Sequence, residues 1–324
     1  MRANGNELLR KAKKNKNDEI YTQLIDIKNE LKHYKDKFKN KVVYCNCDDP
    51  TTSNFYKYFA ENFKALGLKK LISSCYSDNK IDLFNYDQEK RSGYYYKYTG
   101  KNDETIIPTL EDVIYFEDDG DFRSKESIEL LKQADVVVTN PPFSLFRELI
   151  DQIIEYEKEF LVIGNINALT YKEIFKLIKE NKAWMGINMG RGISGFIVPD
   201  SYELYGTETR IDELGNRIVS PNNSLWLTNL DTSRRHTDIP LTKTYKENEA
   251  EYQKYDNYDA INVNKTKDIP RDYKGVIGVP ITFIHKFNPD QFEIIKFRKG
   301  NDNKDLSING KCPYFRILIR NKKI

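Results

Sequence analysis

The chain has 324 residues, of which 39% are apolar and 31% charged, and its net charge at pH 7 is +3. This length is enough for one large domain or two ordinary ones, and the composition is typical of a soluble globular protein. No stretch of about 18 uninterrupted apolar residues is present, which excludes a membrane-spanning helix, and the basic N-terminus lacks the apolar core of a secretory signal. We therefore expect a cytoplasmic protein with no membrane association.

The charge is distributed unevenly along the chain. Residues 1–41 carry 12 Lys and Arg against 6 Asp and Glu, and residues 296–324 carry 9 against 2, which leaves a net charge of about −10 for the middle. Basic ends fit either contacts with nucleic-acid phosphates or two solvated, partly disordered ends, and charge alone favours neither. Residues 1–17 are lysine-rich without an apolar period, which predicts a mobile basic arm.

The four cysteines and three histidines do not have the spacing of a zinc site. In a reducing cytoplasm the cysteines are expected to be small apolar residues within strands. The sequence therefore predicts no metal ion.

Strand and helix patterns alternate from residue 18 to about residue 190. Apolar residues at helical spacing predict a helix over residues 18–39. A strand in "KVVYCNC", a helix that ends at Gly67 and a strand in "LKKLISSCY" follow. Two strands joined by a Gly-rich turn are predicted in "SGYYYKYTGKNDETIIPTL", and one more in "DVIYF".

The alternation then continues with a helix at 124–133, a strand in "DVVVTN", a helix at 143–156, a strand in "EFLVIGN" and a helix in "TYKEIFKLIKEN". This order is typical of a doubly wound α/β sheet. From residue 191 to 324 the short apolar runs, such as "SLWLTNL" and "QFEIIKF", are separated by turn residues. That part is predicted to be rich in strands and loops.

The strand "DVVVTN" ends at Asn140, and Pro141, Pro142 and Phe143 follow. Ligands bind at the carboxyl ends of the strands in an open α/β sheet. The prolines fix φ and remove two backbone donors, which leaves the Asn140 amide oxygen and the Pro141 carbonyl as acceptors beside the flat ring of Phe143.

Such an array suits methylation of an exocyclic amine. The lone pair of an amino group on a planar base is delocalised, and acceptors on its two N–H bonds favour a more tetrahedral, nucleophilic nitrogen. Within a duplex the base has to be flipped out to reach the site. We therefore predict a catalytic role for Asn140, Pro141, Pro142 and Phe143, against the alternative of a proline-stiffened loop.

Taken together, the segments resemble the EcoRI-type adenine-specific DNA methyltransferases, which use S-adenosyl-L-methionine. The resemblance runs from "DEIYTQLIDIKNELKHYKDKF" through "VVYCNCDDPTTSNFYKYF", "GDFRS" and "TNPPFSLFRELI" to "SLWLTNLDTSRRH" and "YFRILIR". It implies a Rossmann-like catalytic domain over residues 18–190, a target-recognition region over residues 191–324, and methylation of adenine N6 in double-stranded DNA. A cognate restriction endonuclease is a further implied associate, without being a required physical partner.

The resemblance also implies cofactor-binding positions. These are Tyr21 and Thr22 near the methionine part, Cys45, Asn46, Asp48 and Asp49 in the loop after the first strand, and Asp121 and Phe122 near the adenine ring. The loop "YCNCDDPTTSN" lacks the glycines usual at this position, so Asp48 or Asp49 is expected to bind the ammonium group of the cofactor. The second strand ends in "SSCY" without an acidic residue, which leaves the residue that holds the ribose unassigned.

Competing interpretations remain open at several of these positions. Tyr21 and Thr22 also suit the start of a helix, and Asp48 and Asp49 also suit a turn. Arg234, Arg235 and His236 fit either contacts with DNA or a solvated run of charges.

The same catalytic quartet also serves enzymes that methylate RNA bases or a protein glutamine, and N4-cytosine methylation is a related possibility. A non-catalytic nucleic-acid-binding relative is an alternative of another class. C5-cytosine methylation needs a cysteine after a proline, whereas the adjacent pair here, Cys312-Pro313, has the reverse order.

Overall fold

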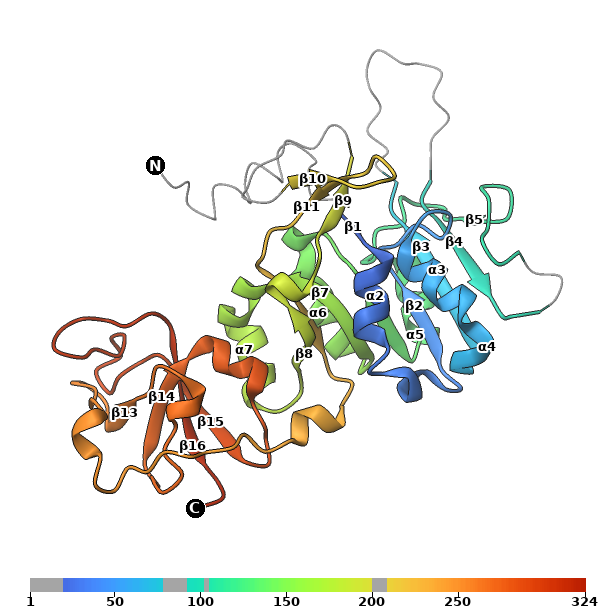
Figure 1. Ribbon diagram of the computed structural model, residues 1–324. Coiled ribbons are helices and arrows are strands. Elements are labelled where there is room, and N and C mark those ends of the chain that lie inside the picture. The colour runs from blue at the N-terminus through green and yellow to red at the C-terminus, as the bar shows by residue number, and fades with distance from the viewer. Residues whose placement is uncertain (1–19, 78–91, 102–104, 200–208) are drawn as a thin grey trace, which may run out of the picture. The chain divides into compact units, whose positions relative to one another are not determined.

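The computed structural model describes residues 20–77, 92–101, 105–199 and 209–324 (Figure 1). The chain divides into two compact units, which we call unit 1 (Met1–Ala168 and Gly186–Leu230) and unit 2 (Leu169–Met185 and Asp231–Ile324). The basic arm predicted for residues 1–17 lies outside the described residues. The boundary predicted at residue 190 separates a catalytic domain from a target-recognition region. The two structural units do not test this functional boundary, which stays a prediction.

An eight-stranded sheet, in the order β5-β4-β3-β2-β6-β7-β12-β8, is the centre of unit 1 (Figure 1). Its middle four strands are mutually parallel. They are β3 (Lys70–Cys75), β2 (Val42–Cys45), β6 (Val136–Thr139) and β7 (Glu159–Asn165). The flanking strands are β4 (Tyr94–Tyr98), β5 (Ile114–Tyr115), β12 (Ser224–Thr228) and β8 (Trp184–Met189).

The strand order reverses between β2 and β6. From β2 the chain moves to β3 on one side, whereas β6 and β7 lie on the other side. The middle strands β2 and β6 are fully buried runs of mainly β-branched residues, as expected for parallel strands covered on both faces. A reversal of this kind opens a crevice at the carboxyl ends of the two strands, and ligands bind there in open α/β sheets.

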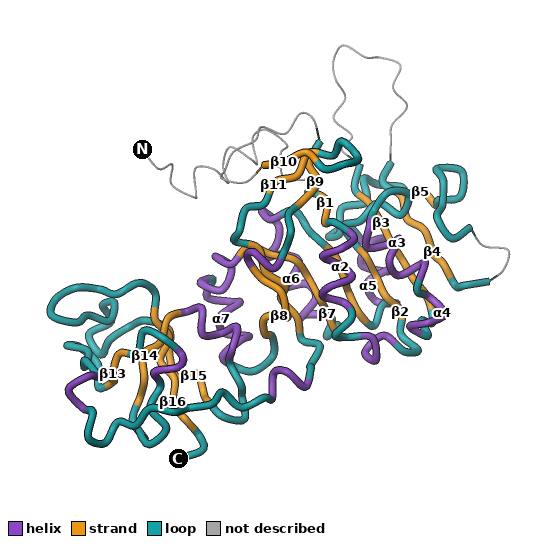
Figure 2. Tube along the Cα trace, viewed as in Figure 1, coloured by secondary structure: helices purple, strands orange, loops and turns teal. Residues whose placement is uncertain are grey.

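Helices cover both faces of this sheet, as Figure 2 shows. One face packs on α2 (Leu24–Leu31), α3 (Asn54–Glu61) and α4 (Phe63–Leu66), whose apolar residues form one core with alternate residues of β2, β6 and β7. The remaining helices of unit 1 are α5 (Lys125–Gln133), which contacts β2, and α6 (Phe146–Glu155), which contacts β7. The mixed α/β class predicted from the sequence is therefore confirmed.

A second, four-stranded sheet of unit 1 has the order β1-β9-β11-β10 and is antiparallel throughout. Its strands are β1 (Tyr21–Thr22), β9 (Phe196–Val198), β11 (Arg217–Val219) and β10 (Thr209–Ile211). The helix predicted over residues 18–39 is therefore wrong at both ends, because Tyr21 and Thr22 are in a strand and α2 ends at Leu31. Pairing with a strand 175 residues later overrides the helical period of this segment.

One other strand prediction needs correction. The second strand expected after Gly100 is absent from residues 105–110, the part of that segment that the structure describes, and β4 pairs with β3 and β5 instead. Pro108 removes a backbone donor there and disfavours a ladder. The strand predicted in "SLWLTNL" is confirmed, and Ser224–Thr228 pairs antiparallel with β7 in the eight-stranded sheet.

Unit 2 contains a four-stranded mixed sheet in the order β13-β14-β16-β15 and the helix α7 (Lys172–Lys179). The strands are β13 (Ala260–Asn262), β14 (Val276–Pro280), β16 (Arg316–Asn321) and β15 (Phe292–Phe297). Phe175 of α7 stacks on Phe297 of β15, with ring centroids 4.9 Å apart. This contact ties the helix, which is distant in sequence, to the sheet.

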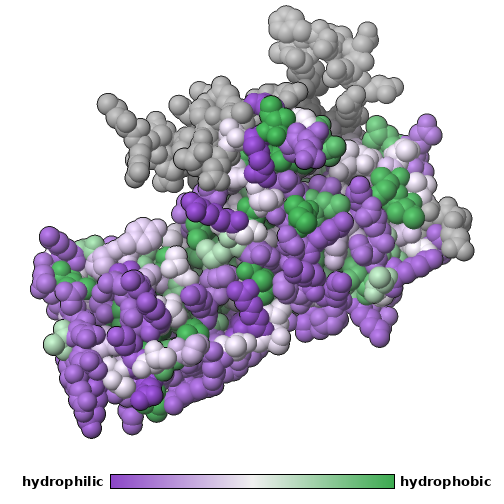
Figure 3. Space-filling model, viewed as in Figure 1, coloured by the Kyte–Doolittle hydropathy of each residue, from purple (hydrophilic) through white to green (hydrophobic). Residues whose placement is uncertain are grey.

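The surface is mainly hydrophilic in the view of Figure 3, with apolar residues in small separate groups. None of the helices in the described segments combines the length and apolarity that crossing a membrane requires.

Candidate active site

The loop after β2 places Asp48 at the strand reversal. Its buried carboxylate accepts hydrogen bonds from Ser53 Oγ at 2.8 Å and from Thr139 Oγ1 at 2.6 Å. Ser53 is also the N-cap of α3, and Thr139 ends β6, so Asp48 connects three elements. Burial raises the pKa of Asp48 to about 6, although the hydrogen bonds from Thr139, Ser53 and the Asn140 backbone N–H act to lower it. Asp48 is therefore ionised at neutral pH and close to its titration range.

Asp49 has a different set of partners. Its Oδ1 accepts from the Thr51 backbone N–H at 2.8 Å and from Thr51 Oγ1 at 2.7 Å, which closes a turn. Its Oδ2 accepts from the Tyr94 hydroxyl at 3.0 Å. Asp49 thus shapes the loop and connects it to β4.

Asn140 follows β6 directly and is 9% exposed. Its Nδ2 donates to the Ile20 carbonyl at 2.6 Å, which fixes the orientation of the amide because a carbonyl can only accept. Its Oδ1 is buried and has no hydrogen-bond partner among the described residues. The amide is therefore locked with its acceptor oxygen available.

The residues after Asn140 form a stiff turn. Pro141 is buried and Pro142 is partly exposed, and the Pro142 carbonyl accepts from the Leu145 N–H at 2.9 Å. Phe143 begins the short 3-10 helix η2 (Phe143–Leu145). Its partly buried ring packs in a T-shaped arrangement with Phe196 of β9, with ring centroids 6.3 Å apart and ring planes at 85°. The four-stranded sheet of unit 1 therefore holds the ring in place.

Two more buried acceptors without partners among the described residues lie in segments where cofactor binding was predicted. They are Thr22 Oγ1 on β1 and Asn46 Oδ1 after β2. The Thr22 carbonyl accepts from Asn54 Nδ2 at 2.9 Å, which connects β1 to the start of α3, whereas the neighbouring Tyr21 is 45% exposed. Three of the nine unpaired buried side-chain atoms in the described chain therefore belong to these loops and Asn140. Since buried polar groups are nearly always paired, this concentration indicates a ligand site.

Asp121 and Phe122 lie in a loop that packs on the end of β3. A Cβ atom on Gly120, whose φ is +76°, would lie 2.7 Å from the Cys75 carbonyl oxygen, so this position requires glycine. Phe122 is buried. Burial acts to raise the pKa of Asp121, but hydrogen bonds from Arg123, including Nη2 at 2.6 Å, hold it below its usual value. Asp121 is thus an anion already paired with Arg123.

Cysteine chemistry does not contribute to this site. Cys45 is fully buried in β2, and burial, with the Asp48 charge, raises its thiol pKa well above the usual value. The pKa of Cys47 is raised for the same reasons. Neither thiol is a ready nucleophile. No group of three His, Cys, Asp or Glu side chains in the described chain is arranged to hold a metal ion.

Two buried carboxylates on α2 hold the chain segment that precedes β9. Glu30 accepts from the Ile187 N–H at 2.7 Å and the Asn188 N–H at 2.8 Å, and Asp26 accepts from the Ser194 N–H at 2.9 Å. Burial raises the pKa of both carboxyls. They fix the chain segment that leads into β9, and hence the strand that contacts Phe143.

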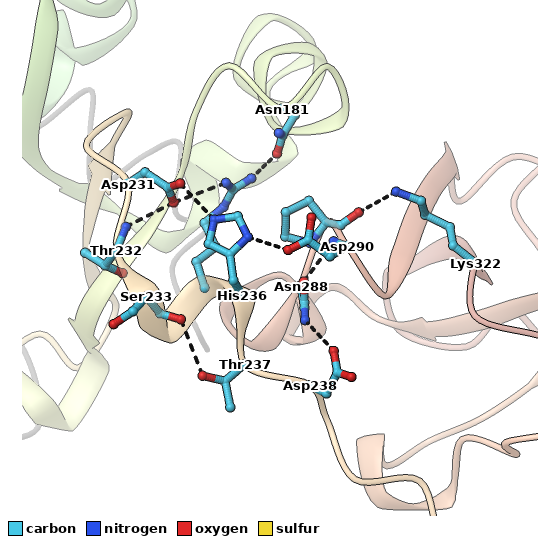
Figure 4. Close-up of polar contacts among 12 residues, drawn as sticks. Asn181, Asp231, Thr232, Ser233, His236, Thr237, Asp238, Asn288, Asp290 and Lys322 are labelled. Carbon is cyan, nitrogen blue, oxygen red and sulfur yellow. Dashed lines mark hydrogen bonds and ion pairs between the residues drawn. The ribbon is translucent and has the colours of Figure 1, made fainter.

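Arg235 and His236 belong to an internal network of unit 2. Figure 4 shows His236 between Asp231 and Asp290. The Arg235 guanidinium lies 3.8 Å above the Trp184 ring and donates to Asn181 and Asp231. Both ring nitrogens of His236 are hydrogen-bonded, to Asp290 at 2.5 Å and to Asp231 at 2.8 Å. Asp290 and Asp231 raise the pKa of His236. Arg234 is exposed.

The structure thus brings Thr22, Asn46, Asp48 and Asn140 into one connected set of loops. Other residues that build this set, namely Ser53, Tyr94 and Thr139, were not among those predicted from the sequence. Ser53 carried a readable signal, because Ser before a helix is a typical N-cap. The contact of Ile20 with Asn140 joins residues 120 positions apart and left no local pattern.

Comparisons with known proteins bear on what this site does. The family model for "Adenine-specific methyltransferase EcoRI" matches residues 8–322. The chain is 66% identical over 319 residues to the Type II methyltransferase M.EcoRI of Escherichia coli, covering 98% of each chain. It is 38% identical to M.MgeORF184P of Mycoplasma genitalium and 36% identical to M.MpnI of Mycoplasma pneumoniae, each over 97% of this chain and 98% of the relative. No solved structure matches the chain.

Proposed function

Because this chain belongs to the EcoRI family of adenine-specific methyltransferases and is an adenine-specific DNA methyltransferase, we propose that the site at the strand reversal binds S-adenosyl-L-methionine and a flipped-out adenine. The methyl group is transferred to the N6 amine of that adenine within a specific sequence of double-stranded DNA.

The unpaired acceptor of Asn140 is the observation that carries this proposal. An N6 amine offers N–H donors, and the buried Oδ1 of Asn140 offers an acceptor with no other partner among the described residues. The Ile20 carbonyl prevents the amide from turning its donor toward the base. Accepting one N–H bond draws the nitrogen toward a tetrahedral geometry and frees its lone pair. Pro141 and Pro142 stiffen this position, and Phe143 offers a ring on which the base can stack.

The donor set in the neighbouring loops fits the cofactor. When bound, S-adenosyl-L-methionine supplies a methyl group on a positively charged sulfur. Asn46 Oδ1 and Thr22 Oγ1 are free to bond its hydroxyl or ammonium groups, and the buried, ionised Asp48 provides the opposite charge for the ammonium. Cys45, Tyr21, Asp49, Asp121 and Phe122 complete the proposed lining.

The proposed Rossmann-like arrangement has independent support. Four parallel strands reverse their order between β2 and β6, and helices cover both faces. Asp48 and Asn140 follow these two strands, where this class of sheet binds ligands.

Contacts with DNA are assigned to the target-recognition region, residues 191–324. We assign the phosphate contact to Arg234, which is exposed, whereas Arg235 and His236 hold the local shape of the same segment. The names of the relatives include Type II methyltransferases, which supports a place beside a cognate restriction endonuclease that the methylation protects against. A DNA substrate also fits the cytoplasmic location expected from the sequence.

Incubation with labelled S-adenosyl-L-methionine and separate pools of DNA, RNA and protein tests the proposal. Label in DNA, recovered as N6-methyladenine, is the expected result. Label confined to RNA or to protein glutamine would show that the substrate is RNA or protein and not DNA. Label recovered as N4-methylcytosine would show that the methylated base is cytosine and not adenine. Calorimetry without detectable cofactor binding would favour a non-catalytic nucleic-acid-binding relative.

A further inference from the structure

The hairpin formed by β10 and β11 presents apolar side chains to solvent at its tip. Leu214 is 87% exposed and Ile211 is 72% exposed, the two highest values for large hydrophobic residues in the described chain. Isolated exposed leucines are ordinary on protein surfaces. This pair requires an explanation because hydrogen bonds to one carboxylate fix the turn that carries it.

The turn between the two strands is organised by Asp212. Its Oδ1 accepts from the Leu214 N–H at 3.0 Å and the Asn216 N–H at 2.8 Å, and its Oδ2 accepts from Asn216 Nδ2 at 2.9 Å. Gly215 supplies the required positive φ of +84°. Leu214 is therefore held outward by a rigid turn.

The base of the hairpin is connected to the active site. Arg210 Nη2 and Ser220 Oγ both donate to the Ser194 carbonyl, at 3.0 and 2.6 Å. Beyond this anchor, β11 pairs with β9, which carries the Phe196 ring that contacts Phe143. β9 in turn pairs with β1, which follows directly on the Ile20 carbonyl that orients Asn140. One small sheet thus joins the exposed tip to both predicted base-holding residues.

We propose that this hairpin is the element that enters the DNA, and that Leu214 occupies the base stack beside the place that the flipped adenine leaves. Ile211 covers the neighbouring base pair. The inference rests on the proposed function, since it requires a flipped adenine. It assigns to DNA an apolar tip that no other described residues cover.

The physical properties of the hairpin fit this role. Leucine and isoleucine act as wedges between base steps in minor-groove proteins that kink DNA, and the proposal assigns the same wedging to a hairpin that enters from the major groove. A two-stranded ribbon fits the major groove, which also displays the N6 amine of adenine. Asp212 is engaged within the turn, and the exposed Glu213 at the tip can accept a hydrogen bond from a cytosine amine in the same groove.

The test compares Leu214→Ala with Leu110→Ala in the full-length protein. Leu110 is 56% exposed, belongs to the same unit and lies outside the hairpin, so it is a matched control. Flipping is followed by the fluorescence of 2-aminopurine at the target position, and methylation is measured on the cognate duplex. For Leu214→Ala we expect about ten-fold slower methylation and a smaller fluorescence increase, with unchanged cofactor binding. Leu110→Ala should behave as the wild type.

A second duplex, in which the base opposite the target adenine is removed, separates the possible outcomes. If Leu214 stabilises the flipped state, most of the lost rate returns on this duplex, because its adenine leaves the stack more easily. A loss of equal size on both duplexes, or no loss on either, would overturn the inference. Failure of the proposed function is distinguishable, since the wild type would then methylate neither duplex.

Discussion

The site at the strand reversal of unit 1 and the Arg235–His236 network of unit 2 are both rich in polar side chains, but they differ in what is left unpaired. Near the strand reversal, Asn140 and Asn46 each keep a buried acceptor without a partner among the described residues. In unit 2, both ring nitrogens of His236 are bonded to carboxylates, and the unpaired buried atom of the network is a donor, Nε of Arg235, whose guanidinium lies over the Trp184 ring. Unpaired acceptors suit a ligand that offers N–H groups, whereas a network of paired charges mainly holds structure. The predictions below test this contrast, from the largest expected effect to the smallest.

Asn140→Ala should reduce kcat by about 10²- to 10³-fold, a size typical of removing one preorganised hydrogen-bond partner from a reacting group. Single-turnover methylation of cognate DNA measures the loss, and calorimetry should find cofactor binding nearly unchanged. Turnover that survives the substitution would contradict the role of the free acceptor.

Glu30→Ala should lower the free energy of unfolding by about 2–4 kcal/mol, because the partly buried N–H groups of Ile187 and Asn188 lose their buried acceptor. Denaturant unfolding measures this change. Glu61→Ala is the control, since its ion pair with Lys57 is exposed and should contribute less than about 1 kcal/mol. Equal effects of the two substitutions would mean that the α2 carboxylates do not support the site.

Cofactor affinity should decrease below about pH 6. The pKa of Asp48 is raised to about 6 by burial, so the proton that enters as the pH falls removes the charge that pairs with the ammonium group. Affinity should fall by about ten-fold per pH unit below that value. Calorimetry between pH 5 and 8 measures this, and Asp48→Asn should bind more weakly with a flat profile. A flat profile in the wild type would assign the ammonium to another residue.

Arg234→Ala and Arg235→Ala should affect DNA binding differently. Loss of one phosphate contact reduces the slope of log K against log[salt] by about 0.9, and we expect this for Arg234. Arg235→Ala should leave the slope unchanged and instead reduce stability, by about 1–2 kcal/mol, through the lost contact with Trp184. A changed slope for Arg235 would show that its network opens to reach DNA.

The smallest effect concerns the stability contributed by His236. Asp290 and Asp231 raise its pKa above 6.5, so its contribution is fully present below pH 6.5 and is lost as the pH rises through the raised value. The carboxylates of Asp290 and Asp231 have lowered pKa values, and their contribution to stability is lost only below pH 3.8. Because the pair is largely exposed, wild type and His236→Asn should differ by less than about 1 kcal/mol in thermal unfolding at pH 5.5, and by less still at pH 8.5. A difference independent of pH would exclude the ion pair as its cause.

The sequence predicted much of the parallel core because its signals are local. The buried strand of β6 is followed directly by Asn140, and a glycine ends α4, so periodicity and turn residues are sufficient there. The helix expected over residues 18–39 could not be corrected in this way, since β1 exists only through its pairing with β9.

The hydrogen-bond partners of the polar residues could not be predicted from the sequence either. Asp48 or Asp49 was expected to bind the ammonium group, but the sequence does not distinguish them. The hydrogen bonds that Asp48 accepts from Ser53 and Thr139, and its raised pKa, depend on burial that composition does not reveal. In the same way, the run Arg234-Arg235-His236 gives no sign that Trp184 lies under one of its members.

The hydrogen bond from Asn140 to the Ile20 carbonyl has a consequence for when the enzyme can work. Until the segment around Ile20 has docked, the Asn140 amide is free to rotate and present either its donor or its acceptor to a base. With the role proposed for Asn140, catalytic competence depends on a contact made across 120 residues, between Ile20 and the loop after β6. A chain that has formed the central strands but has not yet docked the segment around Ile20 would contain Asn140 without its fixed orientation, and would be inactive. Methylation activity would therefore report that unit 1 is fully folded.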